Sequence, residues 1–345
     1  MTAVEAAVAV LVIALLLGLL IPSWLRSRSE ARRAGCRDNL RQLTLAAQGY
    51  VGDHGCLPGG SFDSAGRAHN FGVFIRLLPQ LGERPLYNAL NMNLTHHDVE
   101  NLTIGTVALG VLVCPDDPEA TRPAPMHYSG QPNSPKALLP GIWYQHFGNY
   151  AGNAGTWDLD IDPGAREYPA RVASMNGTIF GMSSVTPAEV TDGSGMTFLF
   201  AERAHTALGL SRVSSRLATW TGTALSEYHF WQSGETVDNL FETWGPPNQH
   251  KIDVGFPKFE NMPFLAANAG SFHPGDGAHF AFCDGSVRFI KESVDSWRLS
   301  RKGIPTPIQY DEGTKSWSLI RGGKPGIYQA LSTRAGGEDI AGRDY

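Results

Sequence analysis

Residues 1–25 read MTAVEAAVAVLVIALLLGLLIPSWL, and this stretch decides how the rest of the chain must be arranged. Residues 6–25 carry no charge, and Ser23 is the only polar side chain among them. A helix of this length spans about 30 Å, the thickness of the hydrocarbon core of a bilayer. Because the stretch is apolar on every side, it predicts a transmembrane helix rather than a helix with one buried face.

Two residues in this stretch are unusual for a plain membrane anchor. Glu5 places a carboxylate at the start of the apolar run, where a charge is costly without a partner, so it is a candidate functional residue. Pro22 lies near the end of the run and is expected to kink the helix or to open its hydrogen-bond ladder. The alternative is a simple anchor, in which Glu5 lies at the membrane surface and Pro22 has no special role.

Beyond the apolar run, the helix is predicted to continue over residues 26–55 as an amphipathic segment. Apolar residues recur there at steps of three and four and form one helical face: Cys36, Leu40, Leu43, Ala47 and Tyr50. Glycines at positions 49, 52 and 55 are expected to end the helix. The remaining residues, 56–345, are rich in Gly and Pro and sparse in charge, which indicates a β-rich globular head.

The net charge of the chain and the distribution of its Lys and Arg residues limit the classes of partner that we expect. The net charge is −5, and no cluster of Lys and Arg with interleaved aromatic residues occurs outside the arginines that follow the apolar run, so nucleic acid is not an expected partner. Those four arginines are Arg26, Arg28, Arg32 and Arg33. By the positive-inside tendency they favour a cytoplasmic end, so a reversed orientation with a cytoplasmic head is an alternative.

Four cysteines are candidates for disulfides: Cys36, Cys56, Cys114 and Cys283. They are widely spaced and form no C-x-x-C pair, which argues against a zinc site on spacing alone. An exported location would permit disulfides, and four cysteines allow three complete pairings between which the sequence does not choose. Free buried thiols are the alternative.

The clearest local signal covers residues 278–290, AHFAFCDGSVRFI. Asp284 and Gly285 predict a two-residue hairpin turn of the primed type. In the register that such a turn imposes, Phe282 lies opposite Val287.

Weaker local signals suggest further elements of the head. Residues 107–113, 178–180 and 197–201 are predicted to be strands, and the Gly/Asn-rich residues 149–155 are predicted to form turns. Residues 217–247 are rich in Trp and Tyr and are expected to be an irregular packed segment.

The N-terminus resembles that of type IV pilin-like proteins, which start with an apolar residue and Thr-Leu-x-Glu before an apolar span. Met1 to Glu5 fill these positions, with Ala3 in place of the usual Leu, and Pro22 matches a proline common in pilin helices. The resemblance implies assembly roles for Met1, Glu5 and Pro22, with Glu5 pairing with the N-terminal ammonium of a neighbouring subunit. No basic leader precedes Met1, so the chain is either written in its mature form, begins late, or is not processed.

The rest of the chain resembles a bacterial family of pilin-like exported proteins, domain of unknown function 1559, whose C-terminus carries a motif described as H-X9-DG. The resemblance rests on these stretches: CRDNLRQLTLA, LLPQLGERPLYNALN, VLVCPDDP, NYAGNAG, VTDGSGMTFLFAER, SFHPGDGAHFAFCDGSVRFI and YQALSTRAGGED. It assigns six positions to family motifs: Asp192, Gly193, Glu202, His273, Asp284 and Gly285. Ten residues, not nine, separate His273 from Asp284. Membership implies export and incorporation into a pilus-like or secretion-like assembly, with no established role for the head.

One group of side chains could carry chemistry. His273, Asp276, His279 and Asp284 fall close together around the predicted hairpin, and Glu202 ends a predicted strand. Imidazole and carboxylate groups suit either a metal site or acid/base catalysis. The alternative is structural: Asp284 serves the turn, and His273 bonds a neighbouring loop.

A second group suggests calcium. Asp158, Asp160 and Asp162 alternate as they do at the start of a calcium-binding loop. Pro163 and Pro169 stand where that motif has Gly and Glu, so the full motif fails. The alternative is an acidic surface loop, and no other cofactor is expected.

Together these features predict an α+β fold, in which a long N-terminal helix, transmembrane over residues 1–25 and amphipathic over 26–55, packs on a β-rich pilin-like head with an antiparallel sheet. The expected function is a pilin-like or pseudopilin-like structural subunit of a type IV pilus or a type II secretion-like assembly, and not an enzyme. Its partners would be the lipid bilayer and other pilin-like subunits. It would cross the inner membrane once, with its head in the periplasm or at the cell surface.

Two other functions compete with this one. A membrane-tethered solute- or glycan-binding protein would use exposed aromatic residues between positions 220 and 244. A tethered hydrolase would require a pocket in which His273 meets Glu202 or Asp284.

Overall fold

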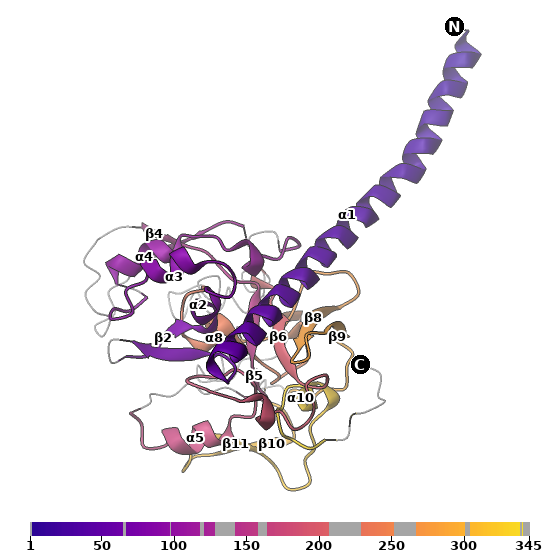
Figure 1. Ribbon diagram of the computed structural model, residues 1–345. Helices are drawn as coiled ribbons and strands as arrows, with labels where there is room; N and C mark the ends of the chain where they lie inside the picture. Colours follow the sequence, from indigo (N-terminus) through magenta and orange to yellow (C-terminus); the bar gives the residue numbers. More distant parts are fainter. Residues whose placement is uncertain are drawn as a thin grey trace.

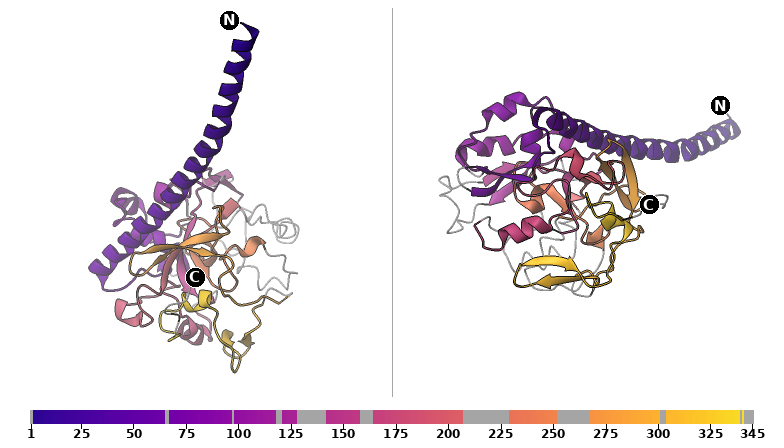
Figure 2. Two further views of the ribbon diagram at one scale, coloured as in Figure 1. Left: turned by 90° about the vertical axis from the view of Figure 1, so that its right-hand side faces the viewer. Right: turned by 60° about the horizontal axis from the view of Figure 1, so that its bottom comes forward.

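The computed structural model has an α+β fold in which one long helix leaves a compact head (Figures 1 and 2). It describes residues 2–64, 67–96, 98–117, 121–127, 142–157, 164–206, 229–251, 267–300, 304–338 and 340. The predicted fold class is confirmed: the second half of the helix packs on a head built around a sheet.

Helix α1 (Ala3–His54) is 52 residues long and has a defined cap at each end. At its start, Glu5 N donates to Thr2 Oγ1 (3.3 Å) and Thr2 N donates to Glu5 Oε2 (2.9 Å), which together form a capping box. At its end, Gly55 adopts the left-handed conformation (φ 77°) that residues with a Cβ avoid. Pro22 does not break the helix, which continues through it along a curved path (Figure 1).

The two halves of α1 have different surroundings. All five residues of the predicted apolar face, positions 36, 40, 43, 47 and 50, are buried against the head. In the first half, the large apolar side chains are exposed, and none of them belongs to the hydrophobic cores formed by the described residues. The 3.6-residue periodicity therefore identified the packed half correctly.

The central sheet has five strands in the order β7-β5-β6-β8-β9. Their bounds are β5 Tyr150–Gly155, β6 Phe198–Glu202, β7 Leu240–Glu242, β8 Gly277–Phe282 and β9 Val287–Lys291. Strands β5, β6, β8 and β9 pair antiparallel, whereas β7 joins β5 in parallel. Every residue of β5, β6 and β8 is buried, because both faces of the sheet are covered.

A separate hydrophobic core lies on each side of the sheet. On one side, the buried face of α1 packs with Tyr150, Phe200 and Ala281. On the other side, Phe198 and Phe280 stack with ring centroids 4.5 Å apart and form a second cluster with the C-terminal helix α10 (Ile327–Ala330). The sheet is thus fixed between the N-terminal and C-terminal helices.

Shorter elements surround this centre. Three hairpins are formed by β1 (Ser61–Ser64) with β2 (Arg67–Gly72), β3 (Ala124–His127) with β4 (Ile142–Gln145), and β10 (Ile308–Asp311) with β11 (Ser316–Leu319). The short helices are α2 (Val73–Leu77), α3 (Arg84–Ala89), α4 (Val99–Gly105), η1 (Gly110–Leu112), α5 (Tyr168–Ser174), η2 (Pro187–Glu189), α8 (Thr236–Asn239) and η4 (Gln249–Lys251). The β10–β11 hairpin lies at the end of the head away from the N-terminus (Figure 1).

The β8–β9 hairpin forms as predicted, but its register differs by one residue. Ala281, not Phe282, lies opposite Val287. The connection holds one residue more than a two-residue turn, because Phe282 N donates to Ser286 O (2.9 Å) and Gly285 takes a positive φ of 92°. This is the pattern of a three-residue loop that ends in a glycine bulge. The alternation of apolar and polar residues along a strand does not show how many residues the loop contains, so the extra residue was not predictable from it.

Three other local predictions were wrong. Residues 149–155 were expected to form turns, but most of this segment is the buried strand β5. Residues 107–113 contain the short 3-10 helix η1 in place of a strand, and residues 178–180 form the end of a bend and irregular chain. The strand predicted at 197–201 is confirmed as β6.

Candidate functional site

The helix and the head are joined covalently where they meet. Cys36 on α1 and Cys114 after η1 form a disulfide, with Cα atoms 5.2 Å apart. Cys56 and Cys283 are free thiols. The structure therefore matches neither alternative fully: one of the possible bridges forms, and the other two cysteines stay unpaired.

Polar contacts hold the disulfide in position. Asn39, one helical turn beyond Cys36, donates from Nδ2 to Val113 O (3.0 Å) and to the Tyr150 hydroxyl (3.2 Å). The Tyr150 hydroxyl in turn lies 3.3 Å from Cys36 O. On the loop side, Cys114 N donates to the side chain of Asn149 (2.9 Å).

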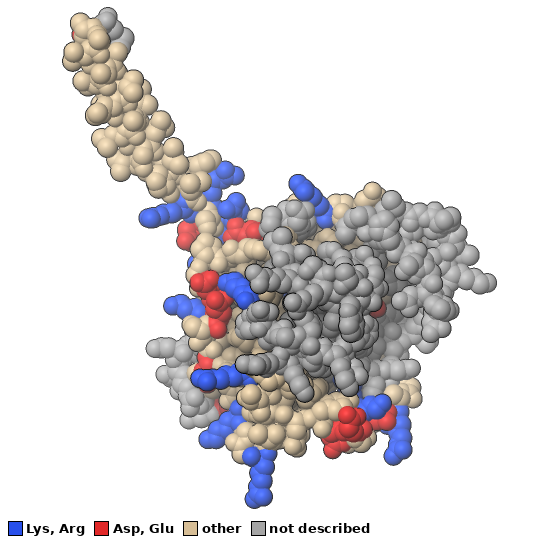
Figure 3. Space-filling view, turned by 180° about the vertical axis from the view of Figure 1, so that it is seen from behind, with Lys and Arg blue, Asp and Glu red and all other residues tan. Residues whose placement is uncertain are grey.

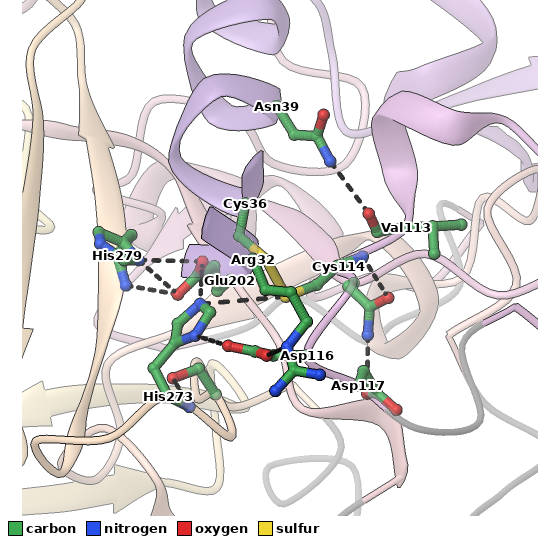
Figure 4. Close-up of a disulfide and its surroundings, with 12 residues drawn as sticks. Arg32, Cys36, Asn39, Val113, Cys114, Asp116, Asp117, Glu202, His273 and His279 are labelled. Atoms are coloured by element: carbon green, nitrogen blue, oxygen red, sulfur yellow. Dashed lines mark hydrogen bonds and ion pairs between the residues drawn. A yellow bond between two sulfur atoms is a disulfide. The ribbon is translucent and has the colours of Figure 1, made fainter. Parts of the chain in front are cut away.

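A chain of charged and titratable side chains lies against this disulfide (Figure 4). We call it the junction cluster, and its members are Arg32, Asp116, Glu202, His273 and His279. Arg32 Nε lies 2.6 Å from Asp116 Oδ1, and Asp116 Oδ2 lies 2.6 Å from His273 Nδ1. His273 Nε2 lies 2.9 Å from Glu202 Oε1, and His279 Nδ1 lies 3.1 Å from the same oxygen. His273 Nε2 is also 3.9 Å from Cys114 Sγ.

Three parts of the sheet region deliver the inner members of this cluster. Glu202 is the last residue of β6, and His279 lies in the neighbouring strand β8. The backbone N–H of His279 donates to Glu202 Oε2 (2.7 Å), which fixes the carboxylate. His273 lies in the loop before β8, where its N–H donates to Ser271 Oγ (3.1 Å).

Burial and hydrogen bonding set the charge of this cluster. Burial alone would raise the pKa of Glu202, but hydrogen bonds from His273 and His279 outweigh it and bring that pKa to about 2. For His273, burial lowers the pKa, but hydrogen bonds and charges from Glu202 and Asp116 raise it above the usual value. Glu202 is therefore ionised, and His273 is favoured as an imidazolium between two carboxylates.

Two residues that the sequence grouped with His273 lie elsewhere. Asp276 is at the surface, where its carboxylate pairs with Lys251 Nζ (2.9 Å). Asp284 lies in the hairpin loop, where Oδ1 accepts from Ser286 N (2.8 Å). The structural alternative therefore explains Asp284. His273 and Glu202 meet, as the acid/base and metal hypotheses required, but the His273 side chain has no exposed surface.

The remaining family-motif residues, Asp192 and Gly193, lie in a turn. Asp192 accepts from Thr333 Oγ1 (3.1 Å), Gly336 N (2.7 Å) and Gly337 N (2.9 Å). Gly193 takes a φ of 100°. This turn anchors the C-terminal STRAGG segment rather than forming a reactive site.

The sequence analysis missed Arg32 and Asp116 as members of the junction cluster. Asp116 lies two residues after Cys114 in the VLVCPDDP stretch, and that proximity was the available signal. From the sequence alone, Arg32 is recognisable only as one of the positive charges that follow the apolar run. Met1 and the aspartates 158, 160 and 162 lie outside the described residues, so the calcium hypothesis gains no structural argument.

The aromatic residues of the glycan-binding alternative are mostly buried where they are described. Trp231 and Trp244 have 0% and 1% of their surface exposed and belong to the core. Trp220 and Tyr228 lie outside the described residues. Within residues 229–244, the structure therefore offers no large aromatic platform.

The free half of α1 is the other functional feature. It is long and apolar enough to cross a membrane, with a window of mean hydropathy 2.9 that is not buried at all. Figure 3 shows this half with almost no charge, and Lys and Arg side chains gather where it meets the head. An apolar N-terminal helix together with a disulfide indicates a membrane-anchored or exported protein.

The chain can be placed in a family. Residues 26–296 match the model of a family described as a protein of unknown function (DUF1559), labelled SBP_bac_10. The chain therefore belongs to the DUF1559 family. Neither a search of curated proteins nor a search of solved structures finds a match.

Proposed function

We propose that this protein is a pilin-like structural subunit, anchored by α1 in the inner membrane and carrying its head in the periplasm or at the cell surface. Its partners would be the bilayer and other pilin-like subunits of a type IV pilus or type II secretion-like assembly. One observation carries the proposal: a single continuous helix exposes an apolar first half and is bonded covalently to the head through its second half.

The disulfide favours the orientation with the head outside the cytoplasm, because disulfides persist mainly in oxidising compartments. Two of the four arginines that follow the apolar run also contact the head. They therefore give weaker support to a cytoplasmic orientation than free arginines would. Arg32 pairs with Asp116, and the Arg33 guanidinium lies 4.0 Å from the centroid of the Phe289 ring.

The position of Glu5 at the tip of the helix supports the proposed assembly of subunits. In the single chain, its carboxylate accepts from Thr2 N at the tip of the helix, with no other side chain of the described residues against it. In a bundle of such helices, the tip would be surrounded by apolar side chains, where an unpaired carboxylate is costly. A neighbouring N-terminal ammonium would neutralise it and fix the axial register between subunits.

The proposal assigns the head no catalytic role and no nucleic-acid partner. The support for the absence of a catalytic role is the burial of the inner members of the junction cluster, since substrate could not reach a side chain as enclosed as His273. The cluster instead lies between α1 and the sheet, where it would hold the helix at a fixed angle to the head.

The test uses two substitutions at one position. Glu5→Gln keeps the capping box, which accepts Gln as well as Glu at this position, but removes the charge. Glu5→Ala removes both. We expect both variants to lose incorporation into filaments or membrane assemblies while the head stays folded, and Glu30→Gln, an exposed glutamate on the same helix, to assemble normally. Normal assembly of Glu5→Gln would overturn the proposal.

A second measurement addresses processing. Mass spectrometry of the N-terminus, on protein from native membranes, should find an N-methylated first residue. An unmodified initiator methionine would separate the chain from the pilin pathway and leave α1 as an anchor only.

A further inference from the structure

The disulfide and the junction cluster together contain an arrangement that neither a structural bridge nor an ion pair requires. One ligand atom from each of four residues belongs to a close group, and these four atoms all lie within 4.8 Å of one another: they come from Cys36, Cys114, Glu202 and His273. All four residues are buried. They come from four separate segments: α1, the loop after η1, the end of β6 and the loop before β8.

The donor set suits one metal ion in particular. Zn²⁺ binds Cys, His and Glu in tetrahedral sites, with ligand bonds of about 2.0–2.3 Å. The edges of such a tetrahedron are about 3.4–3.8 Å long, by simple geometry from those bond lengths. His273 Nε2 already lies 3.9 Å from Cys114 Sγ and 2.9 Å from Glu202 Oε1, so only opening of the sulfur–sulfur bond and small shifts are needed.

The outer contacts also match those of a zinc site. A ligating histidine commonly donates its second ring N–H to a carboxylate, which fixes the tautomer. Asp116 Oδ2 lies 2.6 Å from His273 Nδ1, so Nδ1 keeps its proton, and Nε2 can present a lone pair to a metal once its own proton has left. The carboxylate of Glu202 is likewise held, by the backbone N–H of His279.

We propose that, when the Cys36–Cys114 disulfide is reduced, Cys36, Cys114, Glu202 and His273 bind one Zn²⁺ ion, so that the disulfide and the metal are alternative states of one site. A dithiol reductant supplies two electrons and two protons, the sulfur–sulfur bond breaks, and the reductant becomes a disulfide. Coordination then releases the two thiol protons and any proton on His273 Nε2. In the reverse direction, a small-molecule disulfide accepts two electrons from the two thiolates and two protons from the solvent and becomes two thiols, while the Cys36–Cys114 bond re-forms and the metal leaves.

Both states connect α1 to the loop after η1. In the oxidised state the disulfide joins α1 to the loop after η1, and in the reduced state the metal would join α1 to that loop, to β6 and to the loop before β8. The angle between helix and head is thereby preserved in reducing and oxidising surroundings. The widely spaced cysteines argued against zinc in the sequence, but the fold brings two of them to the same histidine and glutamate.

The test uses the full chain in detergent with the two other cysteines removed, as the Cys56→Ser/Cys283→Ser variant. It is prepared without oxygen with a phosphine reductant and titrated with Zn²⁺ in competition with a chromophoric chelator. We expect one bound ion per reduced chain and none per oxidised chain. In that background, Cys36→Ser, Glu202→Gln and His273→Gln should each weaken binding at least tenfold, and Asp116→Asn should weaken it about 10–100-fold as an outer partner.

Because substitutions in the cluster could unfold the protein, X-ray absorption of the zinc-loaded Cys56→Ser/Cys283→Ser chain gives an independent result. Two sulfur and two nitrogen or oxygen ligands are expected, and Co²⁺ in place of Zn²⁺ should show the visible bands of a tetrahedral thiolate site. No stoichiometric binding by the reduced chain, equal binding by the oxidised chain, or a zinc shell without sulfur would each overturn the proposal.

Discussion

His273 Nε2 lies 2.9 Å from Glu202 Oε1, and both side chains are withdrawn from solvent, with 0% and 1% of their surface exposed. At the surface, Lys251 Nζ lies 2.9 Å from Asp276 Oδ1, with 42% and 75% exposed. The two pairs have the same separation and differ in burial. They therefore allow a direct measurement of what burial does to an ion pair in this fold.

Breaking the buried pair should cost far more than breaking the exposed one. Glu202→Gln removes one of the two carboxylates that flank the buried His273 imidazolium and leaves only Asp116 to compensate its charge, which should lower the free energy of unfolding by about 3 kcal/mol. Asp276→Asn should lower it by less than about 1 kcal/mol. Denaturant unfolding of the detergent-solubilised chain measures both, and similar losses in the two variants would show that the junction cluster does not stabilise the fold.

Removing the disulfide should destabilise the oxidised protein. The bridge closes a loop between residues 78 positions apart, and the chain-entropy model gives about 4 kcal/mol for such a loop. We expect the Cys36→Ser/Cys114→Ser variant to lose about that much and to unfold at a lower temperature. Cys56→Ser, which removes a free thiol, is the control, and an equal loss in that variant would assign the effect to general packing.

The helical features were predictable because they are local. The apolar face of α1 repeats within one helix, and Gly55 ends that helix by its own backbone preference, so neither depends on distant residues. The junction cluster was not predictable in the same way. Asp116, Glu202 and His273 are far apart in sequence, and only the strand order and the path of α1 bring them together.

Strand β5 shows why a composition rule failed. Its YAGNAG sequence is typical of turns, but here the small residues allow close packing inside the sheet. A Cβ at Gly152 would lie 2.9 Å from Ile179 Cγ2. The Asn153 amide donates to Phe198 O (2.9 Å) and Ser332 O (2.8 Å), so the buried polar group is satisfied by strands and loops that the local sequence does not contain.

The hairpin loop gives a prediction about backbone conformation. Gly285→Ala forces a Cβ into a φ of 92° and should destabilise the protein by about 1–2 kcal/mol. Gly52→Ala, at an open position in helix α1, should instead stabilise it by up to about 1 kcal/mol. Thermal unfolding compares the two, and a neutral Gly285→Ala would contradict the bulged loop.

A buried histidine should make the fold sensitive to acid. Burial first, and then the charge of Arg203, lower the pKa of His205 to about 3. The unfolded chain, with an ordinary histidine pKa near 6.5, therefore binds more protons between about pH 6.5 and 3, and stability falls as the pH drops through this window. Between pH 7.5 and 5.5, the contribution of His205 is about 1 kcal/mol.

The measurement is the difference in unfolding free energy between pH 7.5 and 5.5. We expect His205→Gln to lose less stability over this interval than the native chain, because Gln does not titrate. An unchanged difference in His205→Gln would mean that folding does not lower the pKa of His205.

The free thiol of Cys283 should react unusually slowly with alkylating agents. Burial, reinforced by the charge of Asp284, raises the pKa of Cys283 to about 12. Because the thiolate is the reactive form, iodoacetamide at pH 8 should modify Cys283 about 10²–10³-fold more slowly than a solvated thiol such as glutathione. Peptide mass spectrometry over time measures the rate.

Asp284→Asn keeps a side-chain oxygen that can accept from Ser286 N but removes the charge, so it should speed the reaction while leaving the hairpin intact. Modification of native Cys283 at the glutathione rate would mean that the hairpin loop exposes this thiol to solvent.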